Sequence, residues 1–359
     1  MFELSKEEEE RALAIHRKSI VVDTHNDTIG NLMRGAPPPS HAGVHPPFRG
    51  YREFSLRRTL GERSDEGQID LPRIKEGGVD CLFFAQCVSS PRIRAPLRRL
   101  LQTIDVFHSE VERNADRITL ATTYQKVIDT VKGGKVAAIL SIEGGRPLEG
   151  DIGVLRMVYK LGVRSITLTH FHRNELGDGS RDDSGSHLTD FGAAVVEEMN
   201  RLGMIVDISH INETGFWDVI EKTKSPVIAS HSNCKALCDH HRNLTDEQIK
   251  ALAENGGVIN LSYCGPFIKP NVEFGKPENL KKVSVDDWLD HLDHVVNLVG
   301  PDHVGLGSDF DGGCGFPGMD DITKVPNITR GLVARGYSDE DIEKILGGNN
   351  LRIFKEVLK

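Results

Sequence analysis

Short apolar runs rich in β-branched residues recur along the chain, separated by stretches with the periodicity of amphipathic helices. The eight runs are Ser19–His25, Val79–Gln86, Val136–Glu143, Arg164–His170, Met204–His210, Pro226–His231, Gly256–Tyr263 and His303–Asp309. Nearly continuous apolar runs of this length are typical of strands buried on both faces, as in a parallel sheet covered by helices. Helical periodicity marks intervening segments such as Asp190–Leu202 and Val285–Val299. Strand alternating with helix eight times predicts a (β/α)₈ barrel of the TIM type.

The barrel is predicted to be a single domain over residues 1–359. Residues 1–18 are expected to contain an N-terminal helix, and residues 30–67 to form an insertion after the first strand. Within this insertion, the proline-rich segment Pro37–Pro47 either covers the barrel mouth or is a surface excursion. The polar segment Arg173–Gly185 is expected to be a loop on the same face as the strand ends.

Six of the eight runs end at, or just before, an ionisable residue, which folding does not require. These residues are His25, Glu143, His170, His210, His231 and Asp309. The carboxyl ends of the strands of a barrel face one shared mouth. We therefore expect the six side chains to converge on one site.

The residue types at this mouth are those that bind divalent cations. His25 and Asp27 are two residues apart in an extended segment, so that both side chains point to one face and can grip one ion. Glu143 can bridge two ions, and His210 and His231 end successive strands. Imidazole with carboxylate suits zinc best, with manganese or cobalt as substitutes. Two such ions produce hydroxide from a shared water at neutral pH, which predicts a hydrolase.

Further residues near the strand ends are candidates for catalysis and substrate binding. Asp309 is expected to take the proton of the hydroxide and pass it to a leaving amine, with Asp311 as its competitor in the same loop. His170 either polarises the scissile carbonyl or serves as a third metal ligand. His172 is expected to belong to the loop that follows. Arg242 can bind a carboxylate if it lies at the mouth, although most arginines are ordinary surface residues.

Composition narrows the class of protein. The chain has 44 Lys and Arg against 53 Asp and Glu, a net charge of −9, which argues against nucleic acid or an anionic membrane as a partner. No apolar run is long enough to span a bilayer, and the acidic N-terminus is unlike a signal peptide, so we expect a cytoplasmic protein. The six cysteines are too sparse for a disulfide scaffold. Cys234 and Cys238 are either a metal pair or, more simply, small buried residues on a helix.

Several motifs, in order, resemble the renal (membrane) dipeptidase family of the amidohydrolase superfamily, from about Ile20 to Phe354. They include Asp-Thr-His-Asn-Asp around His25, Ser-Ile-Glu-Gly-Gly around Glu143, Val-Asp-Ile-Ser-His ending at His210, Ser-Pro-Val-Ile-Ala-Ser-His-Ser around His231 and Gly-Ser-Asp-Phe-Asp-Gly around Asp309. The resemblance implies a binuclear zinc dipeptidase on a distorted (β/α)₈ barrel, commonly a homodimer. Enzymes of this family cleave dipeptides and often accept a D-residue at the C-terminal side.

The same resemblance assigns roles to individual residues. The zinc ligands that it implies are His25 and Asp27 for one ion, His210 and His231 for the other, and Glu143 as the bridge. His170 would contact the carbonyl oxygen of the substrate, and Arg242 its terminal carboxylate. Asp309 would be the acid and base, and Tyr263 is a possible substrate contact.

Two departures from the family pattern leave the substrate open. Thr28-Ile29 stands where family members often have Leu-Pro, and the loop after His170 is shorter than in secreted animal members. Lactone or β-lactam hydrolysis on the same metal site is the alternative activity, because the same hydroxide attacks any accessible strained carbonyl. Other amidohydrolases more usually carry His-x-His on the first strand and a carboxylated lysine as the bridge.

A non-catalytic, metal-stabilised binding protein is the alternative from another class. It is disfavoured because Asp309 and His170 add reactive groups that a structural site does not need, and because structural zinc is closed by four ligands.

Overall fold

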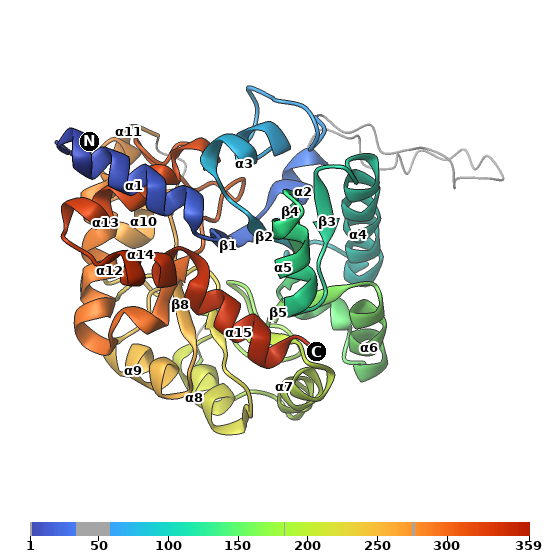
Figure 1. Ribbon diagram of the computed structural model, residues 1–359. Coiled ribbons are helices and arrows are strands. Elements are labelled where there is room, and N and C mark those ends of the chain that lie inside the picture. The colour runs from blue at the N-terminus through green and yellow to red at the C-terminus, as the bar shows by residue number, and fades with distance from the viewer. Residues whose placement is uncertain (1, 34–57, 183, 275–276) are drawn as a thin grey trace.

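The computed structural model of the protein describes residues 2–33, 58–182, 184–274 and 277–359. Among these residues, nine parallel strands lie at the centre and helices surround them (Figure 1). The strands are β1 (Val22–Asn26), β2 (Cys81–Cys87), β3 (Ile118–Leu120), β4 (Val136–Glu143), β5 (Val163–Thr167), β6 (Ile205–Asp207), β7 (Ile228–Ala229), β8 (Val258–Leu261) and β9 (Val304–Leu306). The sheet order is β2-β1-β9-β8-β7-β6-β5-β4-β3, and pairing of β2 with β4 closes eight strands into a barrel.

The ninth strand, β3, lies outside the closed ring. Strand β2 pairs with β4 along seven positions, from Cys81 opposite Ala137 to Cys87 opposite Glu143. On the other edge of β4, β3 pairs with the first residues and β5 with the last ones. The sequence pattern did not predict β3, because three residues are too few to make an apolar run.

The eight predicted strands are all present, and each lies within its predicted run or overlaps it by all but one residue. Most are shorter than the runs: β6, β7 and β9 have two or three residues each. The apolar residues that flank these short strands are buried but not paired in the sheet. The predicted runs are longer than the strands because the length of an apolar run follows burial and not strand pairing.

The helices are α1 (Lys6–Lys18), α2 (Thr28–Leu32), α3 (Leu71–Gly77), α4 (Pro96–Arg113), α5 (Tyr124–Lys132), α6 (Ile152–Lys160), α7 (Asp190–Leu202), α8 (Glu213–Lys222), α9 (Asp246–Glu254), α10 (Gly265–Ile268), α11 (Pro277–Leu280), α12 (Val285–Val299), α13 (Pro326–Ala334), α14 (Asp339–Glu343) and α15 (Asn349–Val357). Helices α7 and α12 have the predicted bounds. Local sequence explains these ends: the hydroxyl of Thr189 accepts from the backbone N of Gly192 at the start of α7, and Gly203 ends it with φ 77°.

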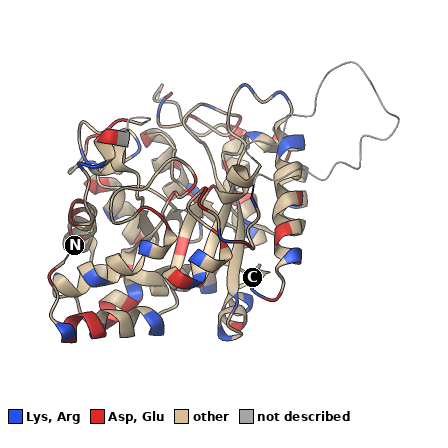
Figure 2. Cartoon of the chain, turned by 90° about the horizontal axis from the view of Figure 1, so that it is seen from above, with Lys and Arg blue, Asp and Glu red and all other residues tan. Residues whose placement is uncertain are grey.

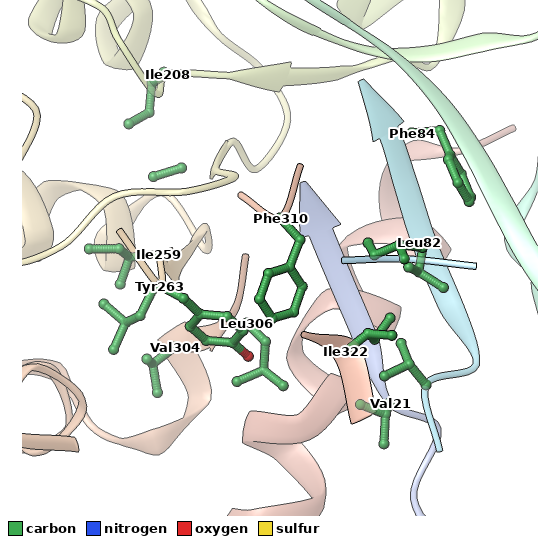
Figure 3. Close-up of a cluster of buried hydrophobic side chains, with 14 of the residues drawn as sticks. Val21, Leu82, Phe84, Ile208, Ile259, Tyr263, Val304, Leu306, Phe310 and Ile322 are labelled. Atoms are coloured by element: carbon green, nitrogen blue, oxygen red, sulfur yellow. The ribbon is translucent and has the colours of Figure 1, made fainter. Parts of the chain in front are cut away.

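Helix α15 covers the barrel at the amino ends of the strands. Its residues Ile353, Phe354 and Val357 form one buried cluster with side chains near the strand starts, including Val22 and Ile205. A second, larger core lies between the strands and the outer helices, and part of it is shown in Figure 3. Because α15 closes one end, the carboxyl ends of the strands are left to carry a site.

Two predicted segments remain to be placed. Pro37–Pro47 lies outside the described residues, so its role as a cover stays a prediction. Arg173–Gly185 runs between β5 and α7 without regular secondary structure where it is described, as expected for a loop.

The outer surface carries both charge signs, which Figure 2 shows spread over the surrounding helices. Within the described part of the chain, no helix combines the length and the apolar character that crossing a bilayer requires.

Candidate active site

The seven residues predicted to form the metal centre, its acid/base group and its contact with the substrate carbonyl meet at the carboxyl ends of the strands. They are His25 and Asp27 at the end of β1, Glu143 as the last residue of β4, His170 after β5, His210 after β6, His231 after β7 and Asp309 after β9. The strand-end pattern therefore predicted their convergence correctly. Except for Asp309 and His170, which are partly exposed, these residues are buried.

The carboxylate of Glu143 is the centre of the cluster. Its Oε1 atom lies 2.9 Å from Nε2 of His210, 3.5 Å from Nε2 of His231, 3.6 Å from Nε2 of His170 and 3.7 Å from Nε2 of His25. Nε2 of His210 and Nε2 of His231 are also only 2.8 Å apart. Four imidazoles thus aim the same ring atom at one carboxylate oxygen.

A second group of ligand atoms gathers around His25. Its Nε2 atom lies 3.9 Å from Oδ2 of Asp27 and 3.9 Å from Oδ1 of Asp309. One ligand atom from each of the three residues lies within 4.8 Å of the other two, and the same holds for His25, Glu143 and His231. His25 therefore belongs to both groups, and the two groups are adjacent.

Burial keeps the imidazoles neutral, and burial together with neighbouring negative charges raises the pKa of the central carboxylate. It lowers the pKa of His25 and of His170 to about 3, assisted by the charge of Arg242. It raises the pKa of Glu143 well above its ordinary value, assisted by the charges of Asp27 and Asp309. Neutral imidazole is the form that binds a metal, and crowded carboxylates need a positive charge among them.

A buried hydrogen-bond chain orients His231. Nδ1 of its ring lies 2.8 Å from the hydroxyl of Ser230, which donates to Oδ2 of Asp207 at 2.5 Å. Asp207 also accepts from the hydroxyl of Thr167 and from the backbone N atoms of Ser209 and Ser230. Nδ1 is therefore occupied, and Nε2 of His231 is left to face Glu143. Outer contacts of this kind fix the orientation of ligand imidazoles in metal sites.

Backbone conformation positions His210 and Asp309, and the carboxylate of Asp23 positions His25. His210 and Asp309 have φ of 68° and 59°, which residues with a Cβ rarely adopt and which costs about 1 kcal/mol or more each. Oδ1 of Asp23 accepts from the backbone N of His25 at 3.2 Å and from that of Ser308 at 2.8 Å. Asp23 thereby ties the end of β1 to the end of β9, and brings His25 next to Asp309.

The structure separates Asp309 from its competitor Asp311. Asp311 is buried and accepts from the hydroxyl of Thr28, the guanidinium of Arg58 and the backbone N of Gln68. Its oxygens are engaged in holding three chain segments together. Asp309 instead faces His25, and burial raises its pKa to about 6.

A family model confirms the resemblance inferred from the motifs. The model that describes membrane dipeptidases, peptidase family M19, matches residues 9–359. The chain belongs to the membrane dipeptidase family. It is therefore a metallo-dipeptidase by family, and a metal cofactor comes with that membership.

Individual relatives agree with this assignment. The chain is 35% identical over 323 residues to dipeptidase tcpJ of Claviceps purpurea, covering 86% of this chain and 74% of that protein. It is 36% identical over 302 residues to dipeptidase verJ of Clonostachys rogersoniana, covering 80% and 75%.

Solved structures of the same family share the fold. The crystal structure of dipeptidase AC, an M19 metallopeptidase, is 28% identical, with a TM-score of 0.81 over 95% of this chain and 99% of that chain. A metallopeptidase of Rhodobacter sphaeroides, liganded with a phosphinate mimic of L-Ala-D-Ala, is 28% identical, with a TM-score of 0.80 over 94% and 99%. The (β/α)₈ barrel prediction is confirmed.

The donor set fits a metal of the family. Nε2 of His25 is buried and has no hydrogen-bond partner among the described residues, although it is surrounded by carboxylate oxygens. A buried polar atom without a partner is costly, and a cation would satisfy it. Imidazole nitrogen and carboxylate oxygen are ordinary zinc ligands.

The predicted substrate-contact residues lie in different surroundings. Arg242 is buried beside the centre, where its Nη2 donates to the carbonyl of His231 at 2.9 Å while its Nε has no partner in the described structure. Tyr263 lies in the core, edge-on to the ring of Phe310 (Figure 3) and also to the ring of Trp288, and its substrate contact stays a prediction. His172 is exposed and binds Asp182, as expected of a loop residue.

Three cysteines at the mouth were missed by the sequence reasoning. Cys87, the last residue of β2, groups with Glu143 and His170, and Cys264 and Cys314 group with Asp309. The strand-end rule that found the histidines also applies to Cys87. Cys264 and Cys314 lie in loops and carry no such signal.

The prediction for Cys234 and Cys238 was half wrong. Both are buried, as expected, but they lie in a turn between β7 and α9 and not on a helix. The backbone N of Cys238 bonds to the carbonyl of Cys234, so one helical turn forms and is not continued.

Proposed function

We propose that the protein is a binuclear zinc dipeptidase that hydrolyses the peptide bond of free dipeptides. The observation that carries the proposal is the position of Glu143, with one carboxylate oxygen within 3.7 Å of the Nε2 atoms of four histidines. A carboxylate at the centre of several ligand imidazoles is suited to bridge two ions. His25 and Asp27 would hold one ion, and His210 and His231 the other.

Bound zinc supplies Lewis acidity, lowering the pKa of water so that a nucleophile forms at neutral pH. The protein's own groups then handle protons and substrate. Asp309 takes the proton released from the nucleophile and delivers it to the leaving amine, a role supported by its position beside His25. The partial burial of Asp309 raises its pKa to about 6, so that it can exchange a proton near neutral pH.

The substrate is held at its two polar ends. His170 lies at the rim, with a side chain that is 20% exposed, and can donate to the carbonyl oxygen as charge develops on it. Arg242 is proposed to bind the terminal carboxylate, because its positive charge is buried next to the centre and its Nε lacks a partner within the described structure. Carboxylate recognition by Arg242 would exclude longer peptides and amides.

We infer that a D-residue is accepted at the C-terminal position. Support comes from the Rhodobacter sphaeroides relative, whose ligand mimics L-Ala-D-Ala. A cytoplasmic location and a homodimer stay predictions from the sequence, to be checked by fractionation and by the mass of the purified protein in solution.

A stereochemical panel tests the proposal. Zinc-loaded protein is assayed against L-L, L-D, D-L and D-D dipeptides, their C-terminal amides, a lactone and a β-lactam, while its metal content is measured. We expect about two zinc ions per chain and turnover of free dipeptides. Rapid hydrolysis of the lactone with none of any dipeptide would overturn the peptidase assignment. One tightly held ion per fully active chain would overturn the bridging role of Glu143.

A further inference from the structure

A second cluster of potential ligand atoms lies beside the proposed metal centre. It consists of the thiols of Cys264 and Cys314 and the carboxylate of Asp309, with one ligand atom from each within 4.8 Å of the other two. Cys264 follows β8, and Cys314 lies five positions after Asp309 in the loop that follows β9. Both cysteines are free thiols.

Asp309 stands between this cluster and the histidine cluster. Its Oδ1 atom faces Nε2 of His25 at 3.9 Å, whereas its Oδ2 atom accepts from the thiol of Cys314 at 3.0 Å. The two oxygens of one carboxylate therefore serve two different groups. An ion held by Oδ2 would occupy the residue that is proposed to move the proton.

The distances suit a thiophilic ion after small adjustments. Zinc–sulfur bonds of about 2.3 Å and tetrahedral angles place two sulfur ligands roughly 3.8 Å apart, and a sulfur and an oxygen roughly 3.5 Å apart. The three ligand atoms here lie within 4.8 Å of one another, so shifts of about 1 Å or less reach that geometry. Rotation of the two cysteine side chains can supply such shifts.

The surroundings select a soft ion over a hard one. Cys264 is fully buried, Cys314 is 7% exposed, and both pack with the ring of Phe267. Burial raises the pKa of both thiols, so they are protonated in the absence of metal. Magnesium or calcium cannot displace those protons, whereas ions that form strong bonds to sulfur can.

We propose that Cys264, Cys314 and Asp309 form an inhibitory site for a thiophilic d¹⁰ cation, Cd²⁺ or excess Zn²⁺, separate from the two ions of the active centre. On binding, each thiol loses one proton to solvent, and the ion bonds to two thiolates and to Oδ2 of Asp309. The inhibitory effect rests on the proposed acid/base function of Asp309, whereas the binding itself does not.

Cadmium binding to the zinc-loaded protein tests the site directly. We expect one Cd²⁺ per chain to produce the ultraviolet charge-transfer band of cadmium thiolate, with a parallel loss of dipeptide turnover that is reversed when a chelator removes the cadmium and zinc is supplied again. Cys264→Ser and Cys314→Ser should each lose the band and bind Cd²⁺ more weakly by at least about 10- to 100-fold, the cost of losing even an outer partner of a metal. Thermal unfolding of each variant checks that it folds.

Two other cysteine variants serve as controls. Cys238→Ser removes a buried thiol that contacts the carbonyl of Pro266 and is not one of the three grouped ligands, and it should leave the band unchanged. Cys87→Ser removes the thiol beside Glu143 and His170. Loss of the band in Cys87→Ser but not in the Cys264 and Cys314 variants would overturn the proposal, since cadmium would then be in the histidine centre.

The remaining outcomes are also decisive. Activity that returns with a reductant and not with a chelator means a Cys264–Cys314 disulfide, and overturns the metal site. A normal band with unchanged turnover keeps the site but refutes the acid/base function of Asp309, so that the two proposals fail separately.

Discussion

Removal of the Ser230 hydroxyl tests whether the buried chain behind His231 sets metal affinity. In the structure this hydroxyl joins Nδ1 of His231, at 2.8 Å, to Oδ2 of Asp207, at 2.5 Å. Ser230→Ala breaks both contacts and leaves Asp207 with the hydroxyl of Thr167 and two backbone donors. The ligand ring of His231 then loses the contact that fixes its orientation.

The expected effect follows from the cost of losing an outer partner. Such losses lower metal affinity by about 10- to 100-fold, or about 1.4–2.8 kcal/mol. Only the ion held by His231 should be affected, because the other proposed ligands keep their contacts. At saturating zinc the turnover number should return close to that of the wild type, since no group that contacts the substrate has changed.

Competition with a chelator at buffered free zinc measures the affinity of the protein for each of its two zinc ions. Ser165→Ala is a matched control, because among the described residues the one hydrogen-bond partner of the buried Ser165 hydroxyl is the carbonyl of Ile205 in the neighbouring strand, at 3.2 Å. Ser165→Ala, which loses one hydrogen bond, should lose about 1 kcal/mol of unfolding free energy, and Ser230→Ala, which loses two, about 2 kcal/mol. Equal zinc affinity in Ser230→Ala and Ser165→Ala would refute the orienting role of Ser230.

Three further predictions concern the acid/base, the carboxylate clamp and stability. Asp309→Asn should keep its metal content but lower kcat by about 10²- to 10⁴-fold, because only proton transfer is lost; full activity would place the base elsewhere. Arg242→Lys should raise KM for free dipeptides and barely change it for dipeptide amides, and equal losses on both would mean that Arg242 only supports the His231 loop. Burial raises the pKa of Asp80 to about 6 from 3.8, so the folded state binds its proton more tightly and this residue's contribution to stability falls as pH rises through that window. Asp80→Asn, which can still accept from the backbone N of Val21, should therefore gain roughly 1–3 kcal/mol over wild type at pH 7 and almost nothing at pH 3.5; urea unfolding that shows the same gain at both pH values contradicts this.

Much of the site could be predicted because residues at the carboxyl ends of barrel strands all lie at the same mouth. His25 is the penultimate residue of β1 and Glu143 the last residue of β4, so both side chains lie at the carboxyl ends of buried strands, at the mouth. His210, His231 and Asp309 come two or three residues after their strands, and their positions depend on the loop. The sequence indicated that they converge, but not that His25 joins both groups of ligand atoms.

The sequence favoured Asp309 over Asp311 as the acid/base group, and the tertiary structure gives the physical reason. Both have positive φ and both follow β9. What separates them is Arg58, 253 positions away in the sequence, whose guanidinium binds Asp311 and leaves Asp309 to face His25. The meeting of Cys264 with Cys314 is likewise a contact between two loops, and no local periodicity encodes it.

By itself, the sequence determined the alternation of strands and helices and the set of residues at the strand ends, because burial imposes a repeating pattern that can be read locally. Only the tertiary structure decided which oxygen, nitrogen or sulfur atom faces which neighbour. Those choices depend on loop backbone angles and on contacts between segments that are distant in the chain.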